Sequence, residues 1–192
     1  MNEEHLTTYE ITKRPATKWG LLHDFSIGHD NQDWTSNCGE CHRQGKSDVS
    51  DCNKAVIREH VRPDMRLIVE IGVCIRSFNE SSTKVLIESM APECTYYGLD
   101  VSDRSSVLPR KDNVKFLQGD SLKVEENIAK LMEGHDYIDL LFIDGNHSVN
   151  FLLNDWRYAE FVRPKTGVVM LHATTYHPGP WCLMESVDPN LF

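Results

Sequence analysis

The sequence has no hydrophobic run long enough to cross a lipid bilayer, which takes about 20 apolar residues. It also has no apolar, positively charged start of the kind that directs secretion, because residues 1–10 are polar and acidic. Positive charge is scarce, and the formal net charge of −9 repels phosphate backbones. We therefore expect a cytoplasmic protein that binds neither membranes nor nucleic acid.

Glycine-rich phosphate-binding motifs are absent as well. Gly72 ends the first strongly apolar run, but the residues that follow it are Val73-Cys74-Ile75-Arg76, so the G-x-G-x-x-G pattern of dinucleotide-binding proteins is missing. The P-loop pattern does not occur either. These absences disfavour a nicotinamide-dependent oxidoreductase.

From residue 52 onward, short apolar runs alternate with segments of helical periodicity. Strands are expected at residues 67–73, 96–101, 114–117, 138–145 and 167–172. Helices are expected at residues 51–60, 82–90, 124–134 and 149–159. Because parallel neighbours need crossover connections, this alternation predicts an α/β fold: a Rossmann-like, doubly wound, mainly parallel sheet with helices on both faces. Residues 52–192 would form this domain, and residues 1–51, an N-terminal extension with two tryptophans, would pack on it.

Acidic side chains gather where the predicted strands end. In open α/β sheets, ligands bind beyond the carboxyl ends of the strands. Four of the five ends carry a carboxylate and none carries lysine or arginine; the residues are Glu70, Asp100, Asp120 and Asp144, with His172 at the fifth end. Such an edge suits a ligand rich in hydroxyls and amines, or a metal ion, rather than a pyrophosphate.

Four segments resemble the motifs of class I S-adenosylmethionine-dependent methyltransferases. The first three are Val69-Glu70-Ile71-Gly72-Val73, Tyr97-Gly98-Leu99-Asp100 and Gly119-Asp120-Ser121. The fourth, Leu141-Phe142-Ile143-Asp144-Gly145-Asn146-His147-Ser148, is the most specific. It is similar to the branch of small-molecule O-methyltransferases related to macrocin O-methyltransferase and the cephalosporin-hydroxylase-type proteins. The resemblance extends from about residue 57 to residue 180.

The resemblance implies that the chain binds S-adenosylmethionine. Asp100 would bind the ribose hydroxyls, since a carboxylate can accept hydrogen bonds from both, and residues 119–121 would lie beside the adenine. The implied cofactor-binding residues are Glu70, Gly72, Val73, Asp100, Gly119, Asp120 and Ser121. The alternative for Asp100 and Asp120 is turn and cap chemistry, because aspartate is common in turns after strands.

The implied reaction is transfer of a methyl group to a hydroxyl of a small molecule or sugar. Asp144, with His147 or His172, would orient or deprotonate the acceptor, because an imidazole titrates near neutral pH. Alternatively, His147 caps the following helix or bonds backbone. Asp144 would also be a metal ligand, but Ala173 stands where metal-dependent relatives commonly have aspartate, so a divalent metal would be held weakly.

Two further departures from the family pattern favour a different function. The loop after Gly72 is long and bulky, so Phe78 or Arg76 could fill the place of the cofactor's methionine part unless the loop swings outward. The usual C-terminal β-hairpin is also lacking. Either the chain is truncated, or the N-terminal segment or a partner chain, as in a homodimer, covers the sheet edge. The alternative function is therefore a catalytically inactive, methyltransferase-like binding or assembly protein.

A cysteine cluster lies in the N-terminal extension. Cys38-Gly39-Glu40-Cys41-His42 matches the C-x-x-C-H pattern of haem attachment, which the expected cytoplasmic location disfavours. Cys38, Cys41 and Cys52, with His42 or His29, could instead hold a structural zinc ion. The other possibility is that these cysteines are free thiols.

Overall fold

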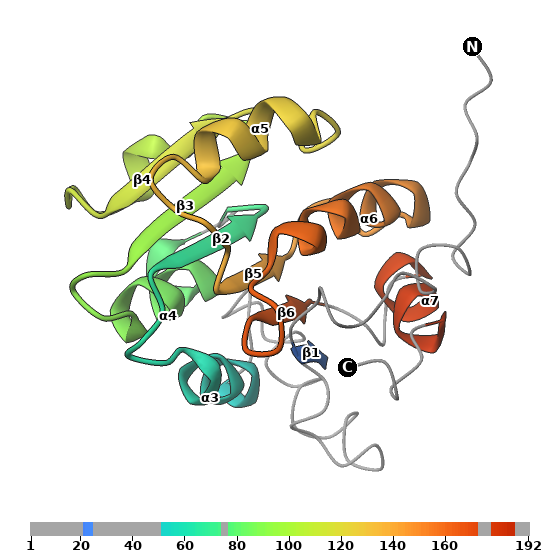
Figure 1. Cartoon of the computed structure of the whole chain (residues 1–192), viewed down its shortest axis with the longest axis horizontal. Helices are drawn as coiled ribbons and strands as arrows, with labels where there is room; N and C mark the ends of the chain where they lie inside the picture. Colours follow the sequence, from blue (N-terminus) through green and yellow to red (C-terminus); the bar gives the residue numbers. More distant parts are fainter. Residues whose placement is uncertain (1–20, 25–50, 74–76, 173–177, 187–192) are drawn as a thin grey trace.

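The computed structural model describes residues 21–24, 51–73, 77–172 and 178–186. These residues build a six-stranded sheet in the order β1-β6-β5-β2-β3-β4, in which every neighbouring pair is parallel (Figure 1). The strands are β1 (Leu21–Asp24), β2 (Leu67–Ile71), β3 (Thr95–Asp100), β4 (Val114–Gln118), β5 (Leu140–Ile143) and β6 (Val168–Leu171). The parallel α/β fold predicted from the alternation of apolar runs is thus confirmed.

Helices cover both faces of the sheet. They are α3 (Asp51–His60), α4 (Ser82–Ser89), α5 (Val124–Leu131), α6 (Val149–Asp155) and α7 (Pro178–Ser186). Short 3-10 turns lie at η2 (Phe78–Glu80), η3 (Ser105–Val107) and η4 (Trp156–Phe161). In the described part of the chain, none of the helices has the length and apolar character needed to span a membrane.

The hydrophobic core has two layers, one on each face of the sheet. Alternate residues of a strand point to opposite faces, so Val69 of β2 packs with α5, α6 and α7, whereas Ile68 packs with α3 and α4. Both side chains are fully buried. Burial on both faces explains why the central strands are continuous apolar runs rather than alternating ones.

The N-terminal segment contributes the edge strand β1. Leu21–Asp24 pairs in parallel with Val168–Leu171 of β6. The N-terminal segment therefore covers this edge of β6. Residues 38, 41 and 42 of the cysteine cluster lie outside the described residues, so the zinc hypothesis stays a prediction.

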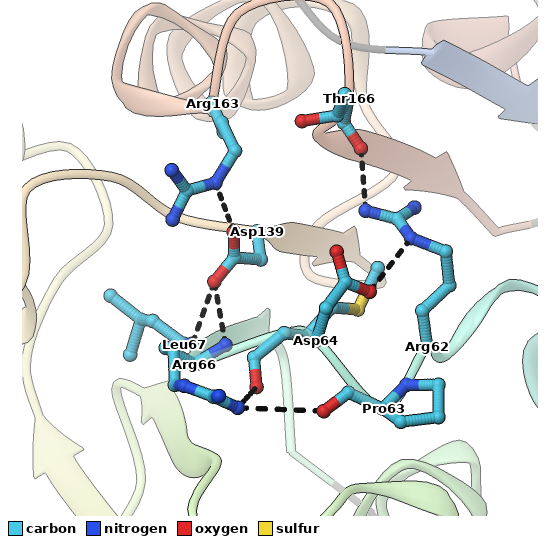
Figure 2. A network of polar contacts seen from close by, with 9 residues as sticks. Arg62, Pro63, Asp64, Arg66, Leu67, Asp139, Arg163 and Thr166 are labelled. Carbon is cyan, nitrogen blue, oxygen red and sulfur yellow. Dashed lines mark hydrogen bonds and ion pairs between the residues drawn. The ribbon is translucent and has the colours of Figure 1, made fainter.

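A polar network ties the opposite, amino-terminal ends of the strands together (Figure 2). The buried Asp139 accepts hydrogen bonds from the backbone N–H groups of Arg66 (2.7 Å) and Leu67 (3.1 Å). Its other oxygen pairs with Arg163, and Arg62 donates to the carbonyl oxygen of Thr166 (2.8 Å). Because this network lies away from the carboxyl ends of the strands, its role is structural.

Candidate active site

A cavity of about 840 Å³ lies at the carboxyl ends of the strands. It is lined by residues that follow β2, β3, β4, β5 and β6, which is where a parallel sheet offers its loops to ligands. All the sequence-predicted site residues except one line it: Gly72, Val73, Asp100, Gly119, Asp120, Ser121, Asp144, His147 and His172. The exception is Glu70.

Glu70 is completely buried on the α3 and α4 side of the sheet. Its carboxylate accepts hydrogen bonds from the hydroxyls of Ser82 (2.8 Å) and Tyr96. Burial raises the pKa of Glu70 to about 7, against the lowering effect of these hydroxyls. Ser82 does line the cavity, so Glu70 supports the cavity wall through Ser82 and does not itself face the cavity.

Gly72 has a φ of +88°, in the left-handed region that glycine adopts without strain. A Cβ atom at this position would lie 2.2 Å from the backbone carbonyl oxygen of Asp144. The resemblance implied that Gly72 is one of the cofactor-binding residues. The structure gives a separate reason for glycine at this position: the loops after β2 and β5 touch at Gly72 and leave no space for a side chain.

Asp100 organises the cavity wall at the end of β3. Its Oδ2 accepts a hydrogen bond from the N–H of Val73 (3.0 Å), and its Oδ1 accepts one from the N–H of Ser102 (2.8 Å). These bonds fix the carboxylate against two loops. Each carboxylate oxygen has a second lone pair, so Asp100 can still accept hydrogen bonds from a ligand in the cavity.

The loop 119–121 is held by residues that the sequence analysis did not single out. The carbonyl oxygen of Ser121 accepts hydrogen bonds from the hydroxyl of Tyr158 and the side-chain amide of Asn154, both at 2.9 Å. Asn127 donates to the carbonyl oxygen of Asp120 (2.8 Å) and to the hydroxyl of Tyr158 (2.9 Å). These contacts hold the loop in place at the edge of the cavity.

Other lining residues were also missed. Phe151 reaches the cavity from α6, and Ser81 and Ser82 reach it from the start of α4. Arg104 lines it as well, and its Nε atom is buried with no hydrogen-bond partner among the described residues. No strand end carries lysine or arginine, but among the described residues the loop after β3 brings the Arg104 guanidinium to the cavity.

The loop after β2 does not close the cavity in its described part. Phe78 was a candidate to fill the cofactor's place, but it packs against the core cluster between the sheet and helices α3 and α4. Phe78 is not among the cavity-lining residues. Arg76, the other candidate, lies outside the described residues.

Asp144, His147 and His172 form a compact triad at the end of the cavity next to β5 and β6. His172 Nδ1 lies 2.7 Å from Asp144 Oδ1, and His147 Nε2 lies 3.0 Å from the same oxygen. The side chains are 12–21% exposed, so the triad is largely shielded but open to the cavity. The donor atoms of all three residues lie within 4.8 Å of one another.

The two imidazoles determine the charge state of Asp144. Burial alone would raise the pKa of this carboxyl, but His172 and His147 outweigh burial and hold the pKa below its usual value. Asp144 is therefore an anion at neutral pH. A carboxylate in this position orients the imidazoles and stabilises either of them when it is protonated.

His147 does not occupy the helix-capping position that was its alternative role. Ser148 is the N-cap residue of α6, and its N–H donates to the side-chain oxygen of Asn146 (2.9 Å). The His147 ring instead faces Asp144, and its centroid lies 5.8 Å from that of His172. The arrangement leaves two imidazoles and a carboxylate at the same end of the cavity, where they could exchange protons with a ligand or hold a metal ion.

Comparison with known proteins gives structural neighbours only. No protein-family model matches the sequence, and no curated protein matches it. Among solved structures, the MycE methyltransferase from the mycinamycin biosynthetic pathway, in complex with Mg and SAH, is 23% identical with a TM-score of 0.51. That match covers 68% of this chain and 33% of MycE.

MycE in complex with Mg, SAH and mycinamycin VI is 20% identical, with a TM-score of 0.50, and the match covers 88% of this chain and 42% of MycE. The chain thus spans between a third and a half of the length of this neighbour. The predicted resemblance to methyltransferases is confirmed at the level of the fold: the chain has the α/β fold of the MycE methyltransferase.

Proposed function

We propose that this protein transfers a methyl group from S-adenosylmethionine to a hydroxyl of a small molecule or sugar. The observation that carries the proposal is the layout of one cavity, with Asp100 and the loop 119–121 on one side and the triad of Asp144, His147 and His172 on the other. The structural neighbour MycE was crystallised with SAH and with mycinamycin VI, which agrees with a cofactor and an acceptor sharing such a cavity.

The cofactor would lie against β2, β3 and β4. Asp100 would accept hydrogen bonds from the ribose hydroxyls, a charge-assisted contact. Asp120 and Ser121 would border the adenine, and the ring of Phe151 offers an apolar surface on which it can stack. The carboxylates of Asp100, Asp120 and Asp144 would favour the positive charge of the sulfonium and amino groups.

The acceptor would lie against the triad. Its hydroxyl oxygen attacks the methyl carbon, the carbon–sulfur bond breaks, and S-adenosylhomocysteine leaves as a neutral thioether. The hydroxyl proton passes to His172 or His147, because a positioned imidazole can act as a general base. Asp144 would stabilise the resulting imidazolium. Positioning of the two reactants supplies most of the rate enhancement in such a displacement.

The MycE structures contain Mg, which suggests that a divalent ion could assist methyl transfer in this protein as well. When bound, such an ion supplies charge stabilisation for the acceptor oxygen. Asp144, His147 and His172 would be its protein ligands. A single carboxylate fits Mg²⁺ poorly, because that ion prefers a full set of oxygen ligands.

Calorimetric titration with S-adenosylmethionine and S-adenosylhomocysteine tests the proposal. Micromolar binding is expected in the wild-type protein and should be lost in Asp100→Ala. Asp103→Ala is the matched control, because Asp103 is an exposed aspartate of the same loop and lies outside the cavity. Failure of the wild-type protein to bind either compound at millimolar concentration would instead support the inactive binding or assembly protein.

The inactive alternative rested partly on the idea that Phe78 or Arg76, in the long loop after Gly72, fills the cofactor's place. Phe78 packs against the core, so it leaves the cavity of about 840 Å³ open. Arg76 lies outside the described residues, so this part of the alternative stays open.

A further inference from the structure

The triad of Asp144, His147 and His172 has the donor set of a transition-metal site. We infer that these three residues bind a divalent transition-metal ion such as Zn²⁺ or Co²⁺, and that they bind it in preference to the Mg²⁺ found in the MycE structures. This inference goes beyond the proposed methyl transfer and does not depend on cofactor binding. It concerns the same triad, and an imidazole nitrogen that binds a metal cannot also take the acceptor's proton, so a bound metal would replace the imidazoles in that role.

The spacing of the donor atoms fits a small ion. In a tetrahedral zinc site with Zn–N bonds of about 2.0–2.1 Å, neighbouring ligand atoms lie roughly 3.3 Å apart. Asp144 Oδ1 lies 2.7 Å from His172 Nδ1 and 3.0 Å from His147 Nε2. All the donor atoms are within 4.8 Å of one another. For the three atoms to share one ion, the two imidazole nitrogens would therefore have to approach each other by about 1.5 Å at most.

The chemistry of the donors favours a transition metal over Mg²⁺. Imidazole nitrogen binds zinc, cobalt, nickel, copper and iron well, whereas Mg²⁺ requires oxygen ligands in a near-octahedral arrangement. Two imidazoles and one carboxylate leave open positions for water or for an acceptor hydroxyl. This is the ligand count of catalytic rather than structural metal sites.

No second carboxylate among the described residues is in place to restore an oxygen-rich site. Glu70 is the nearby acidic group that acts electrostatically on Asp144, but its oxygens are engaged by Ser82 and Tyr96 and do not face the cavity. Residue 173, which follows His172 in the sequence, is alanine and offers no side-chain ligand. The negative charge of Asp144 would still attract a cation of any kind, so the two imidazoles determine which metal is selected.

Metal titration of the chelator-treated protein tests the inference directly. Calorimetry with ZnCl₂, CoCl₂ and MgCl₂ is performed without S-adenosylmethionine, and the visible absorption of bound Co²⁺ is recorded in parallel. The expected result is binding of Zn²⁺ and Co²⁺ at least about 100-fold tighter than that of Mg²⁺. The Co²⁺ spectrum should show nitrogen and oxygen ligation and lack a thiolate charge-transfer band.

Variants identify the ligands. His147→Ala and His172→Ala should each weaken Zn²⁺ binding by at least about tenfold, the range that even outer-shell substitutions reach. His135→Ala is the control, since His135 lies after α5 and does not line the cavity. The titrations are repeated in a Cys38→Ser, Cys41→Ser, Cys52→Ser background, because those thiols could hold zinc of their own. Melting curves of the metal-free variants identify any variant that fails to fold; the other histidine variant then provides the test.

Three results would overturn the inference: equal or tighter binding of Mg²⁺, unchanged Zn²⁺ affinity in the folded histidine variants, or no metal binding at all. A separate titration with S-adenosylmethionine distinguishes this failure from failure of the proposed function. Cofactor binding without metal binding overturns only the metal inference. Metal binding without cofactor binding overturns only the methyl-transfer proposal.

Discussion

At the scale of single residues, two glycines with positive φ offer a matched comparison. Gly72 has a φ of +88° and lies against the backbone of Asp144, whereas Gly134 has a φ of +80° and has nothing near its missing Cβ. Gly134→Ala should cost about 1–2 kcal/mol, the penalty of a left-handed alanine. Gly72→Ala should cost about 3–5 kcal/mol, because the loops after β2 and β5 must also separate.

Urea unfolding of both glycine variants measures this difference. The ratio of the two losses in unfolding free energy is more informative than either loss alone, since the two glycines have similar backbone conformations. If the two variants lost the same stability, the contact between Gly72 and Asp144 would not be tight in solution.

Glu70 should make stability depend on pH. Its pKa is about 7 in the folded protein, against 4.5 for an unperturbed glutamate, so the folded state holds a proton over a range in which the unfolded state has lost it. The wild-type protein should therefore lose about 3 kcal/mol relative to Glu70→Gln as the pH rises from roughly 4.5 to above 7. Free energies of unfolding measured at pH 5 and pH 8 check this. Parallel pH profiles for the two proteins would mean that Glu70 titrates normally.

At the scale of elements, Asp139 joins the start of β2 to the segment before β6. Asp139→Ala would remove the acceptor for the N–H groups of Arg66 and Leu67 and leave the Arg163 guanidinium without its partner, so we expect a loss of about 3–5 kcal/mol. Arg163→Ala should cost only about 1 kcal/mol, because the Arg163 side chain is 40% exposed and Asp139 keeps both backbone donors.

Thermal and denaturant unfolding of the two variants compares them. The prediction is that Asp139→Ala loses more stability than Arg163→Ala. A larger loss in Arg163→Ala than in Asp139→Ala would show that the ion pair, and not the backbone contacts of Asp139, holds this end of the sheet.

Five of the six described strands could be predicted from sequence, because each is a short run of mostly apolar residues bounded by helical segments or by polar turns. The strand β1 could not, since its four residues, Leu21 to Asp24, are half polar and too few to give a pattern. Helix α7 was also missed. Its prolines, Pro178 and Pro180, are typical helix breakers, but they lie in the first turn, where backbone N–H groups have no partner within the helix.

The candidate site was predictable for the residues at the strand ends, except Glu70, and for His147 through the resemblance, but not for side chains that reach the cavity from other parts of the chain. The topology of a parallel sheet brings all strand ends to one edge, so Asp100, Asp120 and Asp144 could be grouped without knowing any side-chain direction. Phe151 and Arg104 come from a helix and from a loop. Their side chains reach the cavity through tertiary packing that no local pattern encodes.

At the scale of the whole molecule, β1 should protect the edge of the sheet. Deleting residues 1–24 would leave β6 with unpaired backbone groups on an apolar strand. The backbone amides of Val168–Leu171 should then exchange faster with deuterium, and the protein should self-associate in light scattering. Deleting only residues 1–20 is the control, because it keeps β1.

Similar exchange rates in the two deletions would contradict the pairing of β1 with β6. The homodimer and the division of the chain at residue 51 remain predictions. Light scattering of the full chain, measured in the same series, provides the reference for the two deletions and tests the homodimer.

The cavity is lined by loops that are spread along the sequence between Gly72 and His172. No single segment of the chain contains all of these loops. They come together only when strands β2 to β6 have assembled into the sheet. Whatever occupies the cavity must therefore stabilise the entire sheet and raise its melting temperature as occupancy increases. Thermal-shift screening of alcohols and sugars, with S-adenosylhomocysteine present, could then identify the acceptor without a turnover assay.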